Sequence, residues 1–154
     1  MLKTTNGDLF TGIDGNSIIA HGCNAQGKMN SGFAKELRER YSYGYDAYIA
    51  SVNGPSRHMM GHVIWANNPQ VNGLPIIANC ITQEFYGNNP HALYVNYGAI
   101  EKSLKYVAEE GSRLRSKIHL PLIGGGLANG DRGYLIKLFE YVFYHNDATL
   151  WIKD

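Results

Sequence analysis

The sequence has little of what marks several large classes of protein. Among its 154 residues are only two cysteines, Cys23 and Cys80, and they make no metal-ligand spacing. Two isolated thiols are typical of a reducing compartment rather than of a disulfide-built secreted domain. No stretch approaches the roughly 20 apolar residues that cross a bilayer, and residues 1–10 lack a signal-peptide core. We therefore expect a soluble, cytoplasmic protein with no membrane partner.

The sequence also has no marked excess of charge of one sign, since the formal net charge is +1 and no long run of like charge occurs. Binding to bulk nucleic acid relies on a basic face, so it is not indicated. An anionic small ligand is still allowed, since backbone amides at the start of a helix hold phosphate without basic side chains. The eleven tyrosines leave single-stranded nucleic acid as a weaker alternative.

Predicted strands and helices alternate along the chain, with no repeat, low-complexity tract or linker between them. Short apolar runs predict strands at residues 2–5, 17–23, 62–66, 75–82, 117–122 and 148–152. Apolar residues spaced by three or four predict helices within residues 33–41, 45–52, 97–111 and 135–143. Residues 68–73 would form a hairpin-like or loose connection. This order predicts a single α/β domain over residues 1–154, with helices on both faces of a mostly parallel sheet.

Two segments combine a strand, a glycine-rich loop and a helix in that order. They are HGCNAQGKMNSGFAKELRERY at residues 21–41 and LPLIGGGLANGDRG at residues 120–133. In a parallel sheet such loops gather at the carboxyl ends of the strands, where open α/β sheets bind ligands. Glycine lets the backbone approach a ligand closely, so that successive amides converge on an anion. Two facing loops of this kind would clamp a diphosphate; the alternative is that the glycines only form turns.

Other phosphate and metal motifs are absent from the sequence. No G-x-G-x-x-G follows the first strand, and no P-loop ends in Gly-Lys-Ser/Thr. A nicotinamide-dependent dehydrogenase is therefore a poor fit. Since no cluster of metal ligands occurs either, we expect neither a metal nor a cofactor.

Three motifs in order resemble the macro domain family, and together they span nearly the whole chain. They are GDLF at residues 7–10, HGCNA at 21–25 leading into SGFA at 31–34, and LPLIGGGLA at 120–128. The resemblance implies a three-layer α/β/α fold around a mixed central six-stranded sheet. It also implies ADP-ribose, or its 1″-phosphate, as the small-molecule ligand. We expect the protein to be a monomer.

The resemblance further implies which residues contact the ligand. Asp8, beside Leu9, would accept a hydrogen bond from the adenine amino group, and Asn24 would contact the distal ribose. Trp151 would pack on the adenine. Two sets of amides would hold the two phosphates: Ser31, Gly32 and Phe33 in the first loop, and Gly124, Gly125, Gly126 and Leu127 in the second. Ile123, next to the second set, would also contact the ligand. The alternatives are a turn role for Asp8 and a core role for Trp151.

The His-x-Cys-Asn string resembles the small stand-alone members that remove the phosphate from ADP-ribose 1″-phosphate. His21 is a candidate for proton transfer, because an unperturbed imidazole has a pKa of about 6.5. Asn24 would orient the 1″-group or a water, and Asp131 would be a second acid or base. The alternatives are a buried structural role for His21, a helix cap for Asp131, and a structural thiol rather than a nucleophile for Cys23.

Two other functions are compatible with the same framework. A related branch of the family removes ADP-ribose from acidic side chains with a lysine and an aspartate. Gln83 and Ala128 stand where those residues would fall, so this mechanism is doubtful here. A module that only binds ADP-ribose, without catalysis, requires nothing beyond the two loops.

Overall fold

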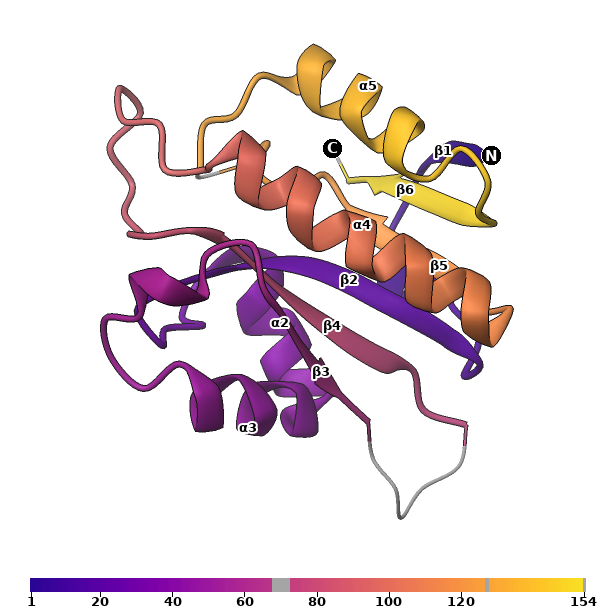
Figure 1. The fold of residues 1–154 in the computed structure, drawn as a ribbon, viewed down its shortest axis with the longest axis horizontal. Coiled ribbons are helices and arrows are strands. Elements are labelled where there is room, and N and C mark those ends of the chain that lie inside the picture. The colour runs from indigo at the N-terminus through magenta and orange to yellow at the C-terminus, as the bar shows by residue number, and fades with distance from the viewer. Residues whose placement is uncertain (68–72, 127, 154) are drawn as a thin grey trace.

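The computed structural model describes residues 1–67, 73–126 and 128–153. Within these residues, one six-stranded sheet forms the middle of the molecule, in the order β1-β6-β5-β2-β4-β3 (Figure 1). All neighbouring strands described are parallel except the edge strand β3, which is antiparallel to β4. The bounds are β1 (Leu2–Asn6), β2 (Ser17–Asn24), β3 (Val63–Ala66), β4 (Ile76–Gln83), β5 (Lys117–Pro121) and β6 (Ala148–Ile152). The predicted mixed six-stranded sheet is confirmed.

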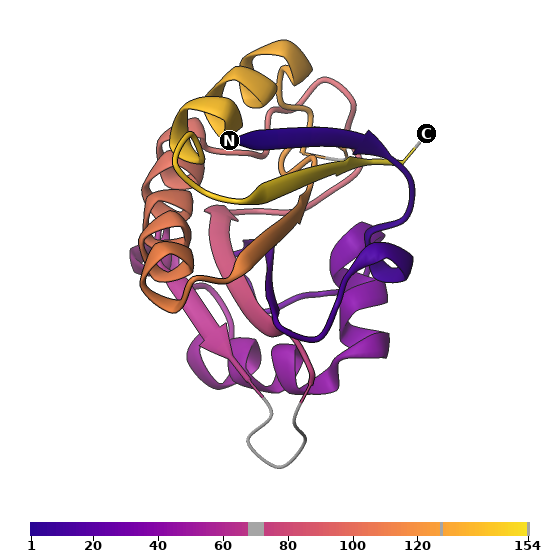
Figure 2. The ribbon, with the colours of Figure 1, turned by 90° about the vertical axis from the view of Figure 1, so that its right-hand side faces the viewer.

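Helices cover both faces of this sheet, so the fold is the predicted three-layer α/β/α arrangement (Figures 1 and 2). One face carries α1 (Leu9–Gly12), α2 (Gly32–Arg40) and α3 (Ser42–Ser51), and the other carries α4 (Tyr97–Leu114) and α5 (Arg132–Val142). A short 3-10 helix (Arg57–Met59) precedes β3. In the described part of the chain, no helix is long and apolar enough to cross a membrane.

Alternate residues of β2 face the two helical layers, as the period of two in a strand requires. Ile18 and Ala20 are fully buried in the core shared with α4 and α5. Ile19, between them, is buried in the core beneath α1 and α2. The apolar stripe predicted for the last helix lies in the first of these cores, with Leu135 and Phe139 completely buried.

The structure differs from the predicted elements at two places. The single-turn helix α1 was not predicted, because four residues are too few to show a helical period. Helix α4 was expected to end at Gly111, but it continues to Leu114 and ends at Arg115 in the left-handed conformation. Gly111 serves packing instead, since a Cβ there would lie 2.6 Å from Ile118 Cδ1. Of the expected connection at residues 68–73, residues 68–72 lie outside the described residues.

The parallel strands β2, β4 and β5 all end at the same edge of the sheet, on the left in Figure 1. Three loops follow them there. We call residues 24–31 the first glycine loop, residues 84–96 the outer loop and residues 122–130 the second glycine loop.

Candidate functional site

A cleft of about 790 Å³ lies where these three loops meet, within the roughly 300–1,000 Å³ usual for ligand pockets. It brings together most of the residues predicted to contact the ligand in the two glycine loops, which are Asn24, Ser31, Gly32, Phe33, Ile123, Gly124 and Gly126. The outer loop adds Tyr86, Gly87 and Asn88 to its lining, which sequence reasoning missed. Gly22 on its floor admits no larger residue, because a Cβ would lie 2.8 Å from Thr82 Oγ1.

The amino end of α2 opens into this cleft with its amides unpaired. Ser31 occupies the N-cap position with extended backbone, but its side chain makes no capping hydrogen bond. Among the described residues, the amides of Gly32, Phe33 and Ala34 have no acceptor. The first amides of a helix carry a partial positive charge. This end of α2 therefore presents a partial positive charge to the cleft.

The second glycine loop is folded by its own backbone. The Gly124 carbonyl accepts a hydrogen bond from the Gly130 amide at 2.7 Å, and the Gly125 amide donates to Leu122 O at 3.0 Å. Within the described part of the chain, the amides of Gly124 and Gly126 have no acceptor. Gly125 was expected to hold phosphate, but its amide closes the turn instead. Leu127, expected to do the same, lies outside the described residues.

Asn24 lines the cleft, yet its side chain is bound to its own loop. Its Oδ1 accepts hydrogen bonds from the amides of Gln26 at 3.0 Å and Lys28 at 3.3 Å, and its Nδ2 donates to Lys28 O at 2.8 Å. The Tyr48 hydroxyl also contacts Oδ1, at 2.9 Å. A bulge between Cys23 and Asn24 in the pairing with β4 turns the chain at this point. These bonds give Asn24 a part in shaping the loop.

His21 lies in the interior and is not among the residues that line the cleft. Its Nε2 is 2.6 Å from Asn79 Oδ1. Because the Asn79 amide group donates to the carbonyls of Gly44 and Ile64, its oxygen must accept, and His21 Nε2 must carry the proton. Burial lowers the pKa of His21 to about 4, with the Asn79 hydrogen bond opposing part of that effect. This is the geometry of a neutral structural histidine.

Asp131 caps helix α5. Its Oδ1 accepts the Tyr134 amide hydrogen bond at 2.8 Å, and its own amide donates to the Tyr97 hydroxyl at 2.8 Å. It does not belong to the described lining of the cleft. These contacts match the alternative role of Asp131 as a helix cap rather than its expected role as an acid or base.

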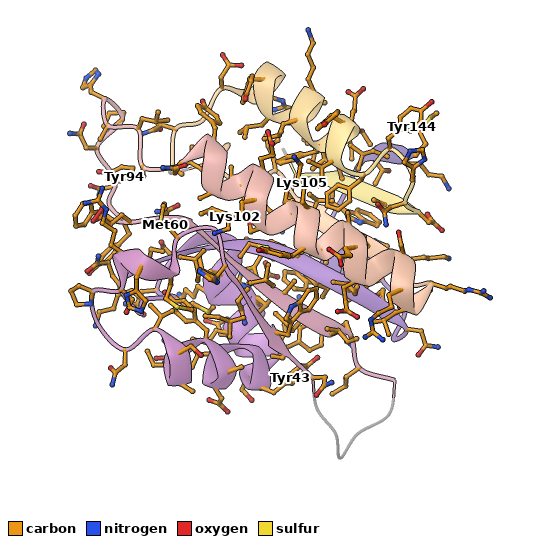
Figure 3. All side chains as sticks on the ribbon, in the orientation of Figure 1. Tyr43, Met60, Tyr94, Lys102, Lys105 and Tyr144 are labelled. Atoms are coloured by element: carbon orange, nitrogen blue, oxygen red, sulfur yellow. The ribbon has the colours of Figure 1, made fainter. Side chains whose placement is uncertain are left out.

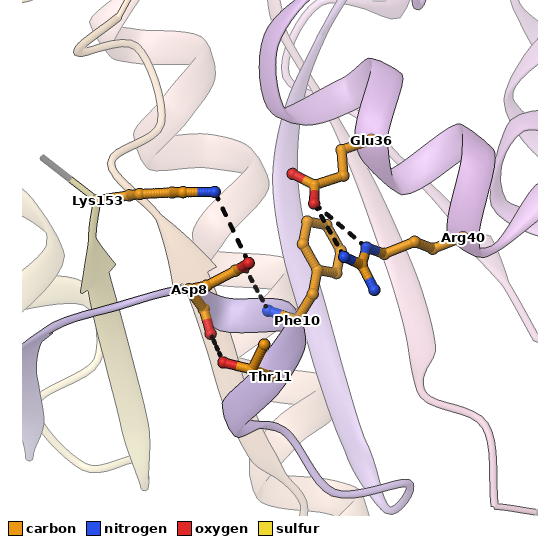
Figure 4. A network of polar contacts seen from close by, with 6 residues as sticks. All are labelled: Asp8, Phe10, Thr11, Glu36, Arg40 and Lys153. Carbon is orange, nitrogen blue, oxygen red and sulfur yellow. Dashed lines mark hydrogen bonds and ion pairs between the residues drawn. The ribbon is translucent and has the colours of Figure 1, made fainter.

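Asp8 and Leu9 lie at the carboxyl end of β1, outside the cleft lining. Asp8 caps α1 by accepting the Phe10 amide at 3.0 Å and forms an ion pair with Lys153 at 3.7 Å (Figure 4). Arg40 of α2 stacks over the Phe10 ring at 4.9 Å and ties this corner to α2. Leu9 is buried in the core.

Trp151 packs beneath α1. A Cβ at Gly12 would lie 2.1 Å from its ring, and its Nε1 donates to His119 Nδ1 at 3.0 Å. Both contacts lie within the protein, as expected if Trp151 has the alternative role of a core residue. His119 Nε2 is buried and, within the described residues, has no partner.

The outer loop is fastened to the second glycine loop. Asn129, whose φ is 62°, donates from Nδ2 to Asn89 O at 2.9 Å and to Ala92 O at 2.6 Å. The amides of Tyr94 and Val95 both donate to Ala128 O. The loops that form the rim of the cleft are thus held as one unit.

The cleft carries few ionisable groups. In its described lining these are Cys23, Lys28 and Tyr86, and no carboxylate or imidazole lines it. Burial raises the pKa of the Cys23 thiol well above its usual value, so it is not a nucleophile at neutral pH. Gln83 and Ala128 both line the cleft. Across the described ranges, no three His, Cys, Asp or Glu side chains group as a metal site.

No family model and no curated protein matches the chain, but solved structures match nearly all of it. A protein of unknown function from Bacteroides thetaiotaomicron is 24% identical with a TM-score of 0.84, over 99% of this chain and 98% of that one. A Streptomyces coelicolor macrodomain is 25% identical with a TM-score of 0.76, over 100% and 99%. Thermosipho africanus DarTG, in complex with ADP-ribose, is 14% identical with a TM-score of 0.79, over 98% of this chain and 41% of that one.

Proposed function

We propose that this chain, which has the macrodomain fold, binds ADP-ribose with its diphosphate between the two glycine loops. One observation carries the proposal. Among the described residues, the amides of Gly32 and Phe33 at the start of α2 and those of Gly124 and Gly126 have no acceptor, and all four residues line the same cleft. A diphosphate offers an anion to each set, and hydrogen bonds to charged groups are worth about 1.5–3 kcal/mol each.

The charge of the cleft supports an anionic ligand. Lys28 lies at its rim, and no carboxylate lines the part that the structure describes. A phosphate there would meet amides and one cation without repulsion. The ADP-ribose in the structurally similar Thermosipho protein supports the choice of ADP-ribose among diphosphates.

The adenine end of the ligand would lie toward the carboxyl ends of β1 and β6. There the Asp8 carboxylate is paired with Lys153, whose side chain is 66% exposed. An exposed ion pair contributes only about 0–1 kcal/mol, so an adenine amino group can compete for Asp8. Trp151 is assigned no contact with adenine in this proposal, because its ring and N–H are engaged internally.

Binding is better supported than hydrolysis. Removal of the 1″-phosphate was expected to use His21 and Asp131, but neither lines the cleft, and a buried neutral imidazole with a pKa of about 4 is a poor base at pH 7. Asn24 lines the cleft, but its side chain is bound within its own loop. Removal of ADP-ribose from acidic side chains has no better support, since Gln83 and Ala128 supply no amine or carboxylate.

Calorimetry with ADP-ribose tests the proposal, and Gly126→Glu makes the test specific. A Cβ at Gly126 meets nothing within 4 Å, so the glutamate fits the fold and places a carboxylate at the phosphate seat. We expect the affinity for ADP-ribose to fall at least about tenfold, equivalent to about 1.4 kcal/mol.

Gly133→Glu is the matched control, because Gly133 is exposed and lies outside the described cleft lining. It should bind as the unmodified protein does. No heat of binding for the unmodified protein, or equal affinity in both variants, would reject the proposed site. Phosphate release from ADP-ribose 1″-phosphate, measured in parallel, would reinstate catalysis.

A further inference from the structure

We propose that Tyr48 of α3 is a positioning residue, whose hydroxyl holds the first glycine loop so that the amino end of α2 faces the ligand. This inference rests on the proposed function for its effect on affinity. Tyr48 is completely buried and would touch no ligand. Tyr48 affects the affinity for the ligand through the first glycine loop.

The hydroxyl of Tyr48 makes contacts with both ends of the loop's first turn. It lies 2.6 Å from Asn24 O and 2.9 Å from Asn24 Oδ1, and it accepts the Gly27 amide at 3.1 Å. A phenol has a single proton, so the two Asn24 oxygens share it. Burial raises the pKa of Tyr48 to above its usual range, which keeps that proton in place.

The contacts of Tyr48 extend through Asn24 to the rest of the turn. Oδ1 of Asn24 also accepts the amides of Gln26 and Lys28. One side-chain oxygen of Asn24 and one phenol oxygen therefore organise consecutive amides from Gln26 to Lys28. Without the hydroxyl, the Gly27 amide would be buried without an acceptor, which a folded protein avoids by moving the chain.

The loop also packs against the end of the helix that carries Tyr48. Gly27 has φ of 83°, and a Cβ there would lie 2.5 Å from Val52 O. Gly27 is thus fixed from both sides, by the Tyr48 hydroxyl and by the backbone at the end of α3. Beyond it, the same loop leads through Ser31 into the unpaired amides of α2.

Tyr43 provides a matched control on the same helix. Its hydroxyl also donates to a backbone carbonyl, that of Pro75, and burial raises its pKa to about 12. In Figure 3, Tyr43 lies at the lower part of the molecule, away from Tyr94 of the outer loop at the upper left. Tyr43→Phe therefore removes an equivalent group without touching the first glycine loop.

The experiment compares Tyr48→Phe with Tyr43→Phe by calorimetry and by amide hydrogen exchange. For Tyr48→Phe we expect the Kd for ADP-ribose to rise about tenfold, the effect of about one hydrogen bond to a charged group. The amides of Gly27 and Lys28 should exchange faster in the free protein. Tyr43→Phe should leave the Kd within about twofold and these two amides unchanged.

Unchanged exchange at Gly27 and Lys28 in Tyr48→Phe would overturn the inference, as would equal weakening of binding in both variants. A Tyr48→Phe protein that fails to fold while Tyr43→Phe folds would also overturn it, because the hydroxyl would then be required for the fold itself. If the unmodified protein binds no ADP-ribose, the proposed function is rejected but the inference about Tyr48 is not. The exchange measurement still decides whether Tyr48 positions the loop.

Discussion

The two glycine loops face one cleft but are held in shape by different means. The first is organised by side chains, because Asn24 Oδ1 and the Tyr48 hydroxyl accept the amides of residues 26 to 28. The second is organised by its backbone, through the Gly130 to Gly124 and Gly125 to Leu122 hydrogen bonds. The shape of the first loop therefore depends on side-chain atoms that a substitution can remove, in addition to the close fit of Gly27, whereas the second loop is disturbed by atoms added at Gly124 and Gly130.

The difference follows from how each loop leaves the sheet. β2 bulges at Asn24, and the Asn24 side chain then bonds to Lys28 O in the loop that leads to α2. The second loop turns back on itself within a few residues, and the turn needs glycine at Gly124. At Gly124, φ is 80° and a Cβ would lie 2.8 Å from Val95 Cγ2.

The largest effect of a single substitution at neutral pH is expected from an added side chain in the second loop. At Gly130 a Cβ would lie 2.6 Å from Gly124 O and 2.9 Å from Leu135 Cδ1. The backbone oxygen of Gly124 cannot move away as easily as the end of a side chain. Gly130→Val should therefore lower the free energy of unfolding by about 2–3 kcal/mol. Urea denaturation measures this.

The control in the same loop is Gly126→Ala, where the added methyl group meets open space. It should change stability by less than about 0.5 kcal/mol. Equal stability of the Gly130 and Gly126 variants would show that the second loop is not held by close backbone contact.

A comparison of the strands beneath the loops predicts the response to acid. Each carries a buried histidine, His21 in β2 and His119 in β5. Burial lowers the pKa of both, that of His21 to about 4. The unfolded chain takes up a proton near pH 6.5 and the folded chain does not, so stability is full above that pH and is lost as the pH falls. For His21 the loss between pH 6.5 and about 4 is about 3 kcal/mol.

Denaturation of the His21→Gln variant across this pH range measures how much His21 contributes to the loss of stability. The variant should lose stability less steeply than the unmodified protein below pH 6.5, and His119 should account for part of the slope that remains. An identical slope in both proteins would mean that the pKa of His21 is the same in the folded and the unfolded chain, and would return it as a candidate base.

Much of the fold could be predicted from the sequence because it depends on local patterns. The runs around Ile18, Ile77 and Leu150 are strands, and the period of α5 is regular enough to name its buried residues. Helix α1 could not be predicted, since it is one turn long and its stability comes from the Asp8 cap and the Trp151 ring beneath it. That ring is distant in the sequence.

The candidate site was predictable at the level of motifs but not of side-chain contacts. The order of glycines predicted two phosphate-binding loops, and in the structure residues of both loops line one cleft. The pattern could not indicate that His21 is paired with Asn79, 58 residues away. Nor could it indicate Tyr48, whose spacing within α3 is that of an ordinary core residue. Hydrogen-bond partners that are distant in the sequence decide which polar groups remain available to a ligand.

The most direct measurement is an amide NMR titration of the protein with ADP-ribose. The largest shifts are expected at Gly32, Phe33, Gly124 and Gly126, with one common Kd, because their amides would meet the two phosphates of one molecule. Shifts confined to one loop, or two loops that saturate at different concentrations, would contradict a diphosphate held between them.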